Sequence, residues 1–219
     1  MAEPRVEACI YVLAGTNGAG KSSIGGAAFR AAGTDYFNPD EAARRIASLD
    51  PALTREQANS AAWSQGKRLL ERAIRERLSF AFETTLGGNT ITRLLERALD
   101  AGLDVRVWYV GLEGAELHVA RVKARAAAGG HDIPEATIRA RYHKSRLNLI
   151  ALLPRLRELR LYDNSPHADP AAGEAPEPLP VLHMESGRLV RTCELDRVAT
   201  WAKPILAAAL AGGTGRRRK

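Results

Sequence analysis

One short stretch near the N-terminus constrains the fold more than any other part of the sequence. Residues 15–22 read GTNGAGKS and fit the pattern GxxxxGK[ST] in full. The apolar segment Cys9–Ala14 leads into this stretch, and the alanine-rich segment Ser23–Ala32 follows it. The order of strand, glycine-rich turn and helix is typical of a loop whose backbone N–H groups surround an anion. We therefore predict a P-loop inside an α/β fold.

The residue types in this loop suit a phosphate chain. The glycines permit positive φ and a close approach of the backbone, and the next helix directs its positive dipole end to the same place. We expect the lysine to bind the β- and γ-phosphates and the serine hydroxyl to complete Mg²⁺ coordination. The predicted nucleotide site comprises Gly15, Thr16, Asn17, Gly18, Ala19, Gly20, Lys21, Ser22 and Ser23, with Lys21 also catalytic and Ser22 the metal ligand.

The remaining sequence alternates strand-like segments with longer stretches of helical period. This alternation predicts a three-layer P-loop NTPase fold with a mostly parallel sheet and a helical lid. Helix starts are expected at Asn38-Pro39, at Thr54 with Gln57, and at Asp132 with Glu135. A hairpin should turn at residues 185–187, before a closing helix over Asp196–Leu210. The expected parallel strands are Ala8–Ala14, Thr34–Phe37, Ser79–Phe82, Val105–Val110 and Leu159–Tyr162.

Composition and charge limit the class of protein. With 219 residues, 45% hydrophobic and 26% charged, the chain fits one soluble domain, which we place at residues 1–210 with a lid at about 114–152. The longest apolar runs are far shorter than the roughly 20 residues of a membrane span. The N-terminal segment lacks the basic region of a secretory signal, so we expect a cytoplasmic protein without membrane contact.

The C-terminal residues 211–219 are predicted to be a disordered basic tail. Arg216, Arg217, Arg218 and Lys219 supply four of the seven net positive charges, which leaves +3 for the rest of the chain. No aromatic residues are interleaved with these charges, so nucleic-acid binding is not expected.

Polar residues follow the second and third expected strands, at the sheet edge where ligands bind in open α/β folds. Asp40 could accept a proton from a substrate hydroxyl or orient the metal's waters; it could also be a first-turn acid that favours the helix dipole. Glu83 and Thr85, followed by two glycines, suit a polyhydroxylated acceptor, although the same residues could form a turn and a helix cap. Neither turn carries the DxxG or NKxD signals of a GTPase.

A group of arginines lies on the segment from Gly114 to Leu152. Arg121 and Arg125 share one helical face, and Arg139, Arg141 and Arg146 follow a hinge that contains two glycines. Such a segment could close over the nucleotide and bring positive charge to the transferring phosphoryl group, or it could be a solvated charged face.

Five blocks of the sequence together resemble the zeta-toxin family of P-loop kinases. They are LAGTNGAGKSS, YFNPDEAARRI, FETTLGG, RVKARAAAGGHDIPEATIRARYHKSRLNL and LYDNS, in the family's order, between about Ile10 and Ser165. The resemblance implies an ATP- and Mg²⁺-dependent kinase that phosphorylates the 3′-hydroxyl of the amino sugar in UDP-N-acetylglucosamine. It also implies an antitoxin for those members that are toxins, which we expect to be a separate protein.

The resemblance assigns roles by matching position. Asp40 is the implied catalytic base and also contacts the substrate, and Glu83 and Thr85 contact the sugar nucleotide. Arg125 and Arg141 match the pair that neutralises charge, with Arg121 as the competing nucleotide contact for the first and Arg139 for the second. The alternatives are a P-loop kinase for another sugar, an antibiotic or a nucleic-acid end, and a nucleotide-dependent binding module without turnover.

Overall fold

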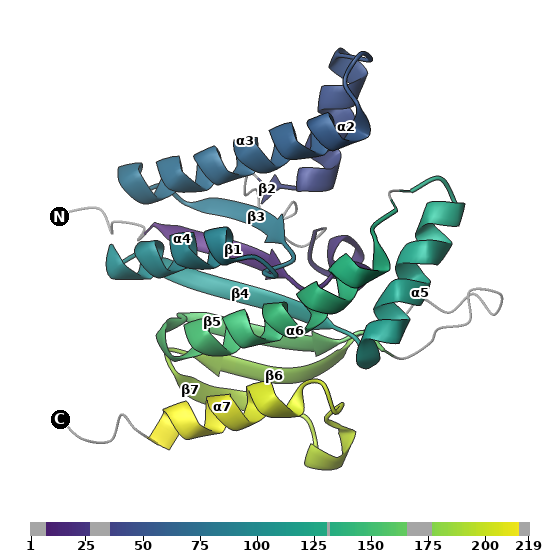
Figure 1. The fold of residues 1–219 in the computed structure, drawn as a ribbon. Coiled ribbons are helices and arrows are strands. Elements are labelled where there is room, and N and C mark those ends of the chain that lie inside the picture. Colours follow the sequence, from purple (N-terminus) through teal and green to yellow (C-terminus); the bar gives the residue numbers. More distant parts are fainter. Residues whose placement is uncertain (1–7, 27–35, 131, 166–176, 215–219) are drawn as a thin grey trace.

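A single sheet organises the computed structural model, which describes residues 8–26, 36–130, 132–165 and 177–214. Within these residues the sheet has seven strands in the order β2-β3-β1-β4-β5-β6-β7 (Figure 1). The strands are β1 (Cys9–Ala14), β2 (Tyr36–Phe37), β3 (Phe80–Thr84), β4 (Asp104–Gly111), β5 (Glu158–Asp163), β6 (Leu179–Glu185) and β7 (Arg188–Thr192).

The sheet is mostly parallel, as the alternating pattern predicts. The pairs β2–β3, β3–β1, β1–β4 and β4–β5 are parallel, whereas β5–β6 and β6–β7 are antiparallel. The expected hairpin at residues 185–187 is confirmed: Ser186 and Gly187 join β6 to β7, with φ of 50° and 75°. Two successive positive φ values give the turn the twist that an antiparallel pair requires. The chain therefore has the predicted α/β fold.

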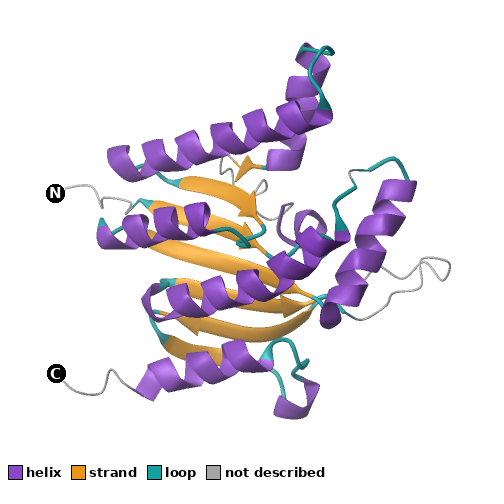
Figure 2. Ribbon diagram, in the orientation of Figure 1, coloured by secondary structure: helices purple, strands orange, loops and turns teal. Residues whose placement is uncertain are grey.

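Two of the helices, whose places in the fold Figure 2 shows, begin at the caps that the sequence predicts. Asn38 caps α2 by accepting from the backbone N–H of Asp40 and Glu41, and Thr54 forms the expected capping box with Gln57 at the start of α3. The elements are η1 (Ser22–Gly26), α2 (Pro39–Leu49), α3 (Arg55–Glu76), α4 (Asn89–Asp100), α5 (Gly114–Ala127), α6 (Glu135–Leu152), η2 (Leu153–Arg155), η4 (Leu195–Arg197) and α7 (Lys203–Thr214).

One expected helix cap and one expected helix start are wrong. The Asp132 carboxylate accepts from the adjacent Ile133 N–H at 2.9 Å, so it does not cap α6, whose N-cap is Pro134 without a side-chain bond. The closing helix starts at Lys203 instead of Asp196, because Trp201, in the turn before it, is buried and donates its indole N–H to Asp163 at 2.9 Å. This helix continues to Thr214, and residues 215–219 of the predicted tail lie outside the described residues.

The main core lies between the sheet and the row α3, α4, α6 and α7 (Figure 1). Alternate residues of β1, Ile10 and Val12, enter this core, whereas Leu13 faces the opposite side. On that side Leu13 lies close to η1, since a Cβ atom on Gly25 would lie 2.5 Å from Leu13 Cδ1. Residues 27–35, which include most of the helix expected over Ser23–Ala32, are outside the described residues. Because the five parallel strands run the same way, their carboxyl ends share one edge.

No helix among the described residues has the length and hydrophobicity to cross a membrane.

Candidate active site

The phosphate loop connects the end of β1 to η1. Its glycines have positive φ, which is 141° at Gly15. A Cβ atom on Gly15 would lie 2.1 Å from the carbonyl oxygen of Val110 in β4, so only glycine fits there. Thr16 is buried, and its carbonyl accepts from the backbone N–H of Ala19 at 3.1 Å. The chain therefore turns tightly at the carboxyl end of the sheet, as the motif predicts. Ser23 lies within η1, but its side chain is outside the described part.

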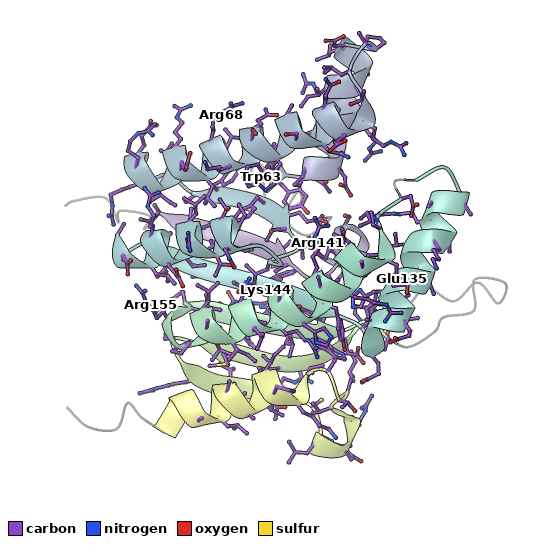
Figure 3. The ribbon with its side chains drawn as sticks, viewed as in Figure 1. Trp63, Arg68, Glu135, Arg141, Lys144 and Arg155 are labelled. Atoms are coloured by element: carbon purple, nitrogen blue, oxygen red, sulfur yellow. The ribbon has the colours of Figure 1, made fainter. Side chains whose placement is uncertain are left out.

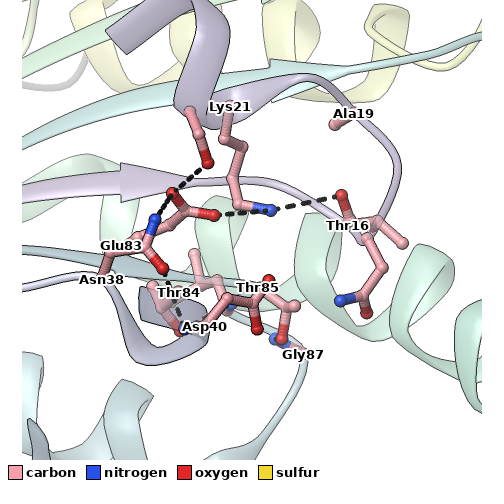
Figure 4. A network of polar contacts seen from close by, with 12 residues as sticks. Thr16, Ala19, Lys21, Asn38, Asp40, Glu83, Thr84, Thr85 and Gly87 are labelled. Atoms are coloured by element: carbon pink, nitrogen blue, oxygen red, sulfur yellow. Dashed lines mark hydrogen bonds and ion pairs between the residues drawn. The ribbon is translucent and has the colours of Figure 1, made fainter. Parts of the chain in front are cut away.

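The Glu83 carboxylate is the centre of the polar contacts beside this loop (Figure 4). One oxygen, Oε2, accepts from Ser22 Oγ at 2.9 Å, from the Tyr36 hydroxyl at 2.8 Å and from Asn38 Nδ2 at 3.2 Å. The other oxygen, Oε1, lies 3.5 Å from Lys21 Nζ. The end of β3 thus places a carboxylate directly on the lysine and serine of the phosphate loop.

Lys21 is oriented by two oxygen atoms at the bottom of the loop. Besides the Glu83 contact, its Nζ donates to the carbonyl of Thr16 at 3.5 Å. Only 7% of the Lys21 side chain and 12% of the Glu83 side chain are exposed, so the pair is weakly screened by solvent. The structure therefore joins Glu83, which the sequence places with the acceptor, to the residues that the sequence places with the nucleotide.

Asp40 and Thr85 lie on the two loops that flank this cluster. Asp40 is exposed in the first turn of α2, while its backbone N–H is bound by Asn38 Oδ1 at 2.8 Å. Thr85 follows β3, and its carbonyl accepts from Ser145 Oγ of α6 at 2.6 Å. Figure 4 shows both residues near Glu83. The carboxyl ends of β2 and β3 therefore present Asp40, Glu83 and Thr85 at one edge.

An open cavity of about 820 Å³ lies next to Asp40. Its walls come from α2, from the start of α3 and from the end of α5 with the following glycines. Three arginines line it, from three different helices, together with an amide. The polar lining residues are Asp40, Arg44, Arg55, Asn59 and Arg125.

The arginines of α5 and α6 divide between the loop, the cavity and the surface. Arg141, labelled in Figure 3, donates to Asn17 Oδ1 at 2.9 Å; burial lowers its pKa, an effect that the charge of Asp40 partly opposes. Arg139 instead forms ion pairs with Glu116 at 2.7 Å and Glu135 at 2.8 Å, away from the loop. Of the two candidates on α6, the structure thus brings Arg141 to the phosphate loop.

The two candidates on α5 occupy different places. Arg121 donates to the backbone carbonyl of Asn164 at 2.9 Å, beside the phosphate loop, and burial lowers its pKa. Arg125, one turn further along, lines the cavity next to Asp40. Arg121 therefore lies beside the phosphate loop and Arg125 at the cavity.

Comparison with known proteins assigns this arrangement to a family. Residues 3–165, which contain all of the site residues above, match the sequence profile described as Zeta toxin. The chain belongs to the zeta toxin family. It is also 33% identical over 132 residues to an uncharacterized protein of Haemophilus influenzae, a match that covers 58% of this chain and 88% of that protein.

Solved structures show the same fold. A chain of the AvrRxo1-ORF1:-ORF2 complex with ATP superposes with a TM-score of 0.63 at 17% identity, covering 93% of this chain and 64% of that one. A chain from the PezAT chromosomal toxin-antitoxin system of Streptococcus pneumoniae gives a TM-score of 0.55 at 10% identity, covering 96% and 87%. The fold shared with these structures thus extends over nearly the whole chain, although the chain spans less than two thirds of the AvrRxo1 chain.

Two buried residues beside the loop of this zeta toxin family member escape prediction from the sequence. Asn164 follows β5 and donates from Nδ2 to the carbonyl of Ala19 at 2.9 Å, and His118 of α5 bonds through Nδ1 to the carbonyl of Asn17 at 2.8 Å. Asn164 could have been found by the same rule as Asp40, since it is a polar residue at a strand's carboxyl end. His118 carries no such signal among the apolar residues of its helix.

His118 makes folding stability depend on pH. Burial is the main cause that lowers its pKa from 6.5 to about 4, and the charges of Lys21, Arg121 and Arg146 add to it. Between these pH values the unfolded chain binds a proton that the folded chain does not, so stability is full above pH 6.5 and falls as pH decreases toward 4. The expected loss is about 2–3 kcal/mol. Urea unfolding at pH 7 and pH 4.5 measures it.

His118→Asn is the matched variant for this measurement, because it keeps a donor but does not titrate. The other acidic and basic groups contribute equally to both proteins, so the variant should lose about 2–3 kcal/mol less between the two pH values. An equal loss in both proteins would show that His118 does not cause the acid sensitivity.

Proposed function

We propose that the chain is an ATP-dependent kinase that phosphorylates the 3′-hydroxyl of the amino sugar in UDP-N-acetylglucosamine. The observation that carries this proposal is the position of Asp40, at the edge of a cavity and at the same end of the sheet as Lys21 and Ser22. A carboxylate between an acceptor cavity and a phosphate loop is what hydroxyl phosphorylation requires. Membership of the zeta toxin family and the ATP complex of an AvrRxo1 chain support it.

The donor atoms beside the loop fit Mg²⁺. Ser22 Oγ and the Glu83 carboxylate are hard oxygen ligands only 2.9 Å apart, and no softer ligand joins them in the described contacts. Mg²⁺ prefers such oxygen ligands together with substrate phosphates. Ser22 would hold the ion, with Glu83 oriented toward it by Tyr36 and Asn38. When bound, the ion supplies neutralisation of charge on the phosphate oxygens.

The residues of this chain then perform positioning and proton transfer. Asp40 takes the proton of the acceptor hydroxyl as the oxygen forms its bond to the γ-phosphorus, and the bond to the bridging oxygen of ATP breaks to leave ADP. Lys21 neutralises charge on the transferring group, and Arg141 lies beside Asn17 where it can do the same. Because the transition state is loose, this electrostatic contribution outweighs any covalent one.

The cavity beside Asp40 has a size and a lining that suit a large anionic acceptor. Its volume of about 820 Å³ suits a sugar nucleotide, since ligand pockets occupy roughly 300–1,000 Å³. Arg44, Arg55 and Arg125 line it, and arginine binds phosphate groups through paired N–H donors. A diphosphate in the cavity would place a linked sugar hydroxyl near Asp40. A separate antitoxin is a further proposed partner, in line with the toxin-antitoxin system named for the PezAT structure.

The direct test is incubation with ATP, magnesium chloride and a panel of acceptors, followed by mass spectrometry. We expect UDP-N-acetylglucosamine to gain the mass of one phosphate group and ADP to appear in equal amount. Phosphate on a different sugar, an antibiotic or a nucleic-acid end would replace the proposed acceptor. ATP binding without transfer to any compound would instead indicate a nucleotide-dependent binding module.

Replacing Arg55 tests whether the cavity holds the acceptor. Arg55→Ala should raise the KM for UDP-N-acetylglucosamine about tenfold, because a charged hydrogen bond to phosphate is lost, while the KM for ATP stays unchanged. Arg68→Ala is the matched control on the same helix, since Arg68 is exposed and does not line the cavity (Figure 3). Identical acceptor KM values for both variants would place the acceptor elsewhere.

A further inference from the structure

Two buried side chains form hydrogen bonds to backbone carbonyl groups of the phosphate loop. His118 Nδ1 lies 2.8 Å from the carbonyl oxygen of Asn17, and Asn164 Nδ2 donates to the carbonyl oxygen of Ala19 at 2.9 Å. His118 is 1% exposed and Asn164 is 4% exposed. A carbonyl oxygen can only accept, so His118 must carry its proton on Nδ1 and Asn164 must present its NH₂ group.

The direction of these two carbonyls fixes the direction of the next two N–H groups. The described chain has no cis peptide bonds, and in a trans peptide unit the C=O and the following N–H point in opposite directions. Holding the Asn17 carbonyl toward His118 therefore turns the Gly18 N–H away from His118. In the same way, the Ala19 carbonyl bound by Asn164 turns the Gly20 N–H away from Asn164.

Both residues are held in place by neighbouring elements. The His118 ring packs on Tyr142 of α6, with ring centroids 5.5 Å apart, and the Tyr142 hydroxyl accepts from the Gly114 N–H at 3.2 Å. The Asn164 N–H donates to the carbonyl of Gly111 at the end of β4, at 3.0 Å. The two side chains thus come from α5 and from the end of β5, which Arg121 of α5 joins by donating to the carbonyl of Asn164 at 2.9 Å.

Gly20 of the loop packs closely against the Asn164 side chain. A Cβ atom there would lie 2.5 Å from Asn164 Nδ2, and φ of Gly20 is 85°. Because any larger residue would push Asn164 away, the glycine and the amide form one unit. The pKa of His118, lowered to about 4 mainly by burial, keeps the ring neutral at pH 7, and the Asn17 carbonyl at 2.8 Å selects the tautomer with its proton on Nδ1.

We propose that His118 and Asn164 are positioning residues that aim the Gly18 and Gly20 N–H groups at the nucleotide phosphates. They set the shape of the anion cradle before ATP arrives, which lowers the cost of ordering the loop on binding. The inference rests on the proposed function only in taking ATP as the ligand. It is independent of the acceptor.

The test is calorimetric titration of ATP, with magnesium chloride, into the full chain and four variants. His118→Leu and Asn164→Leu each remove a donor and should weaken ATP binding about fivefold to tenfold. His118→Asn keeps a donor at the δ position and should restore affinity to within about twofold of wild type. Asn148→Leu is the control: its amide donates to the Leu86 carbonyl at 2.8 Å, on the loop after β3, and its loss should leave ATP affinity unchanged.

Steady-state kinetics distinguish positioning from general damage to the fold. In His118→Leu and Asn164→Leu the KM for ATP should rise while the KM for the acceptor stays constant. If a leucine variant does not fold, as judged by thermal unfolding, the alanine variant at the same position takes its place. Wild-type ATP affinity in the folded variants would overturn the inference, as would a failure of His118→Asn to recover it.

The outcomes separate this inference from the proposed function. A wild-type chain that binds ATP but phosphorylates no acceptor contradicts the proposed reaction. The ATP affinities of the variants still test the roles of His118 and Asn164 in that case. A wild-type chain that does not bind ATP contradicts both.

Discussion

Asp40→Asn is expected to lower kcat by about 10²–10⁴-fold while the chain still binds ATP. Asparagine has nearly the same shape as aspartate but cannot accept the proton of the acceptor hydroxyl. The backbone N–H of residue 40 would still donate to Asn38 Oδ1, so the start of α2 should persist. Turnover with UDP-N-acetylglucosamine, or with whichever acceptor the panel identifies, gives kcat, and calorimetry gives the ATP affinity.

Glu41→Gln is the matched control for Asp40→Asn. Both changes remove one negative charge from the first turn of α2, where an acid contributes about 0.3–1 kcal/mol through the helix dipole. Any effect of that charge on stability is therefore common to both variants, and only Asp40→Asn should lose turnover. A fully active Asp40→Asn enzyme would remove Asp40 from the reaction as a base and leave it the role of a first-turn acid.

Lys21→Met is expected to reduce phosphoryl transfer by at least about 10²–10³-fold, with weaker ATP binding as well. The methionine keeps much of the apolar stem of the side chain, whereas the charge that faces Glu83 Oε1 at 3.5 Å is lost. Turnover and ATP titration measure both effects. Lys67→Met is the control, because Lys67 also pairs with a glutamate, Glu71 at 3.6 Å, but on the surface of α3.

Loss of Lys21 also leaves the Glu83 carboxylate without its cationic neighbour. Glu83 retains its bonds from Ser22, Tyr36 and Asn38, so we expect a moderate loss of stability rather than unfolding. The double variant Lys21→Met/Glu83→Gln removes the unpaired charge and should recover stability without recovering transfer. Activity in the folded double variant would show that Lys21 is not required.

Much of the fold and part of the site could be predicted from local patterns. The glycine loop has a strand before it and a helical turn after it, and the Thr54 capping box and the hairpin at residues 185–187 depend only on neighbouring residues. The meeting of Asp40 and Glu83 at one edge follows from parallel strands, whose carboxyl ends must coincide.

The remaining features depend on tertiary packing. His118 binds the carbonyl of Asn17 from a helix about a hundred residues away in the sequence. Asp132 accepts from the N–H of Ile133 and does not cap α6. The late start of α7 depends on Trp201 reaching Asp163. The contact of Glu83 with Lys21 and Ser22, rather than with an acceptor alone, depends on the register that pairs Leu13 with Glu83 in adjacent strands.

The contacts of α6 limit how far this helix can move relative to the loops of the site. Arg141 reaches the phosphate loop, Ser145 bonds to the carbonyl of Thr85, and Asn148 bonds to that of Leu86, so one face of the helix is tied at three successive turns. The helix cannot rotate about its axis unless these three hydrogen bonds break together. We therefore expect α6 to keep its position when ligands bind, so that any displacement of α5 relative to α6 must break the ion pairs of Lys123 with Glu135 and of Arg139 with Glu116.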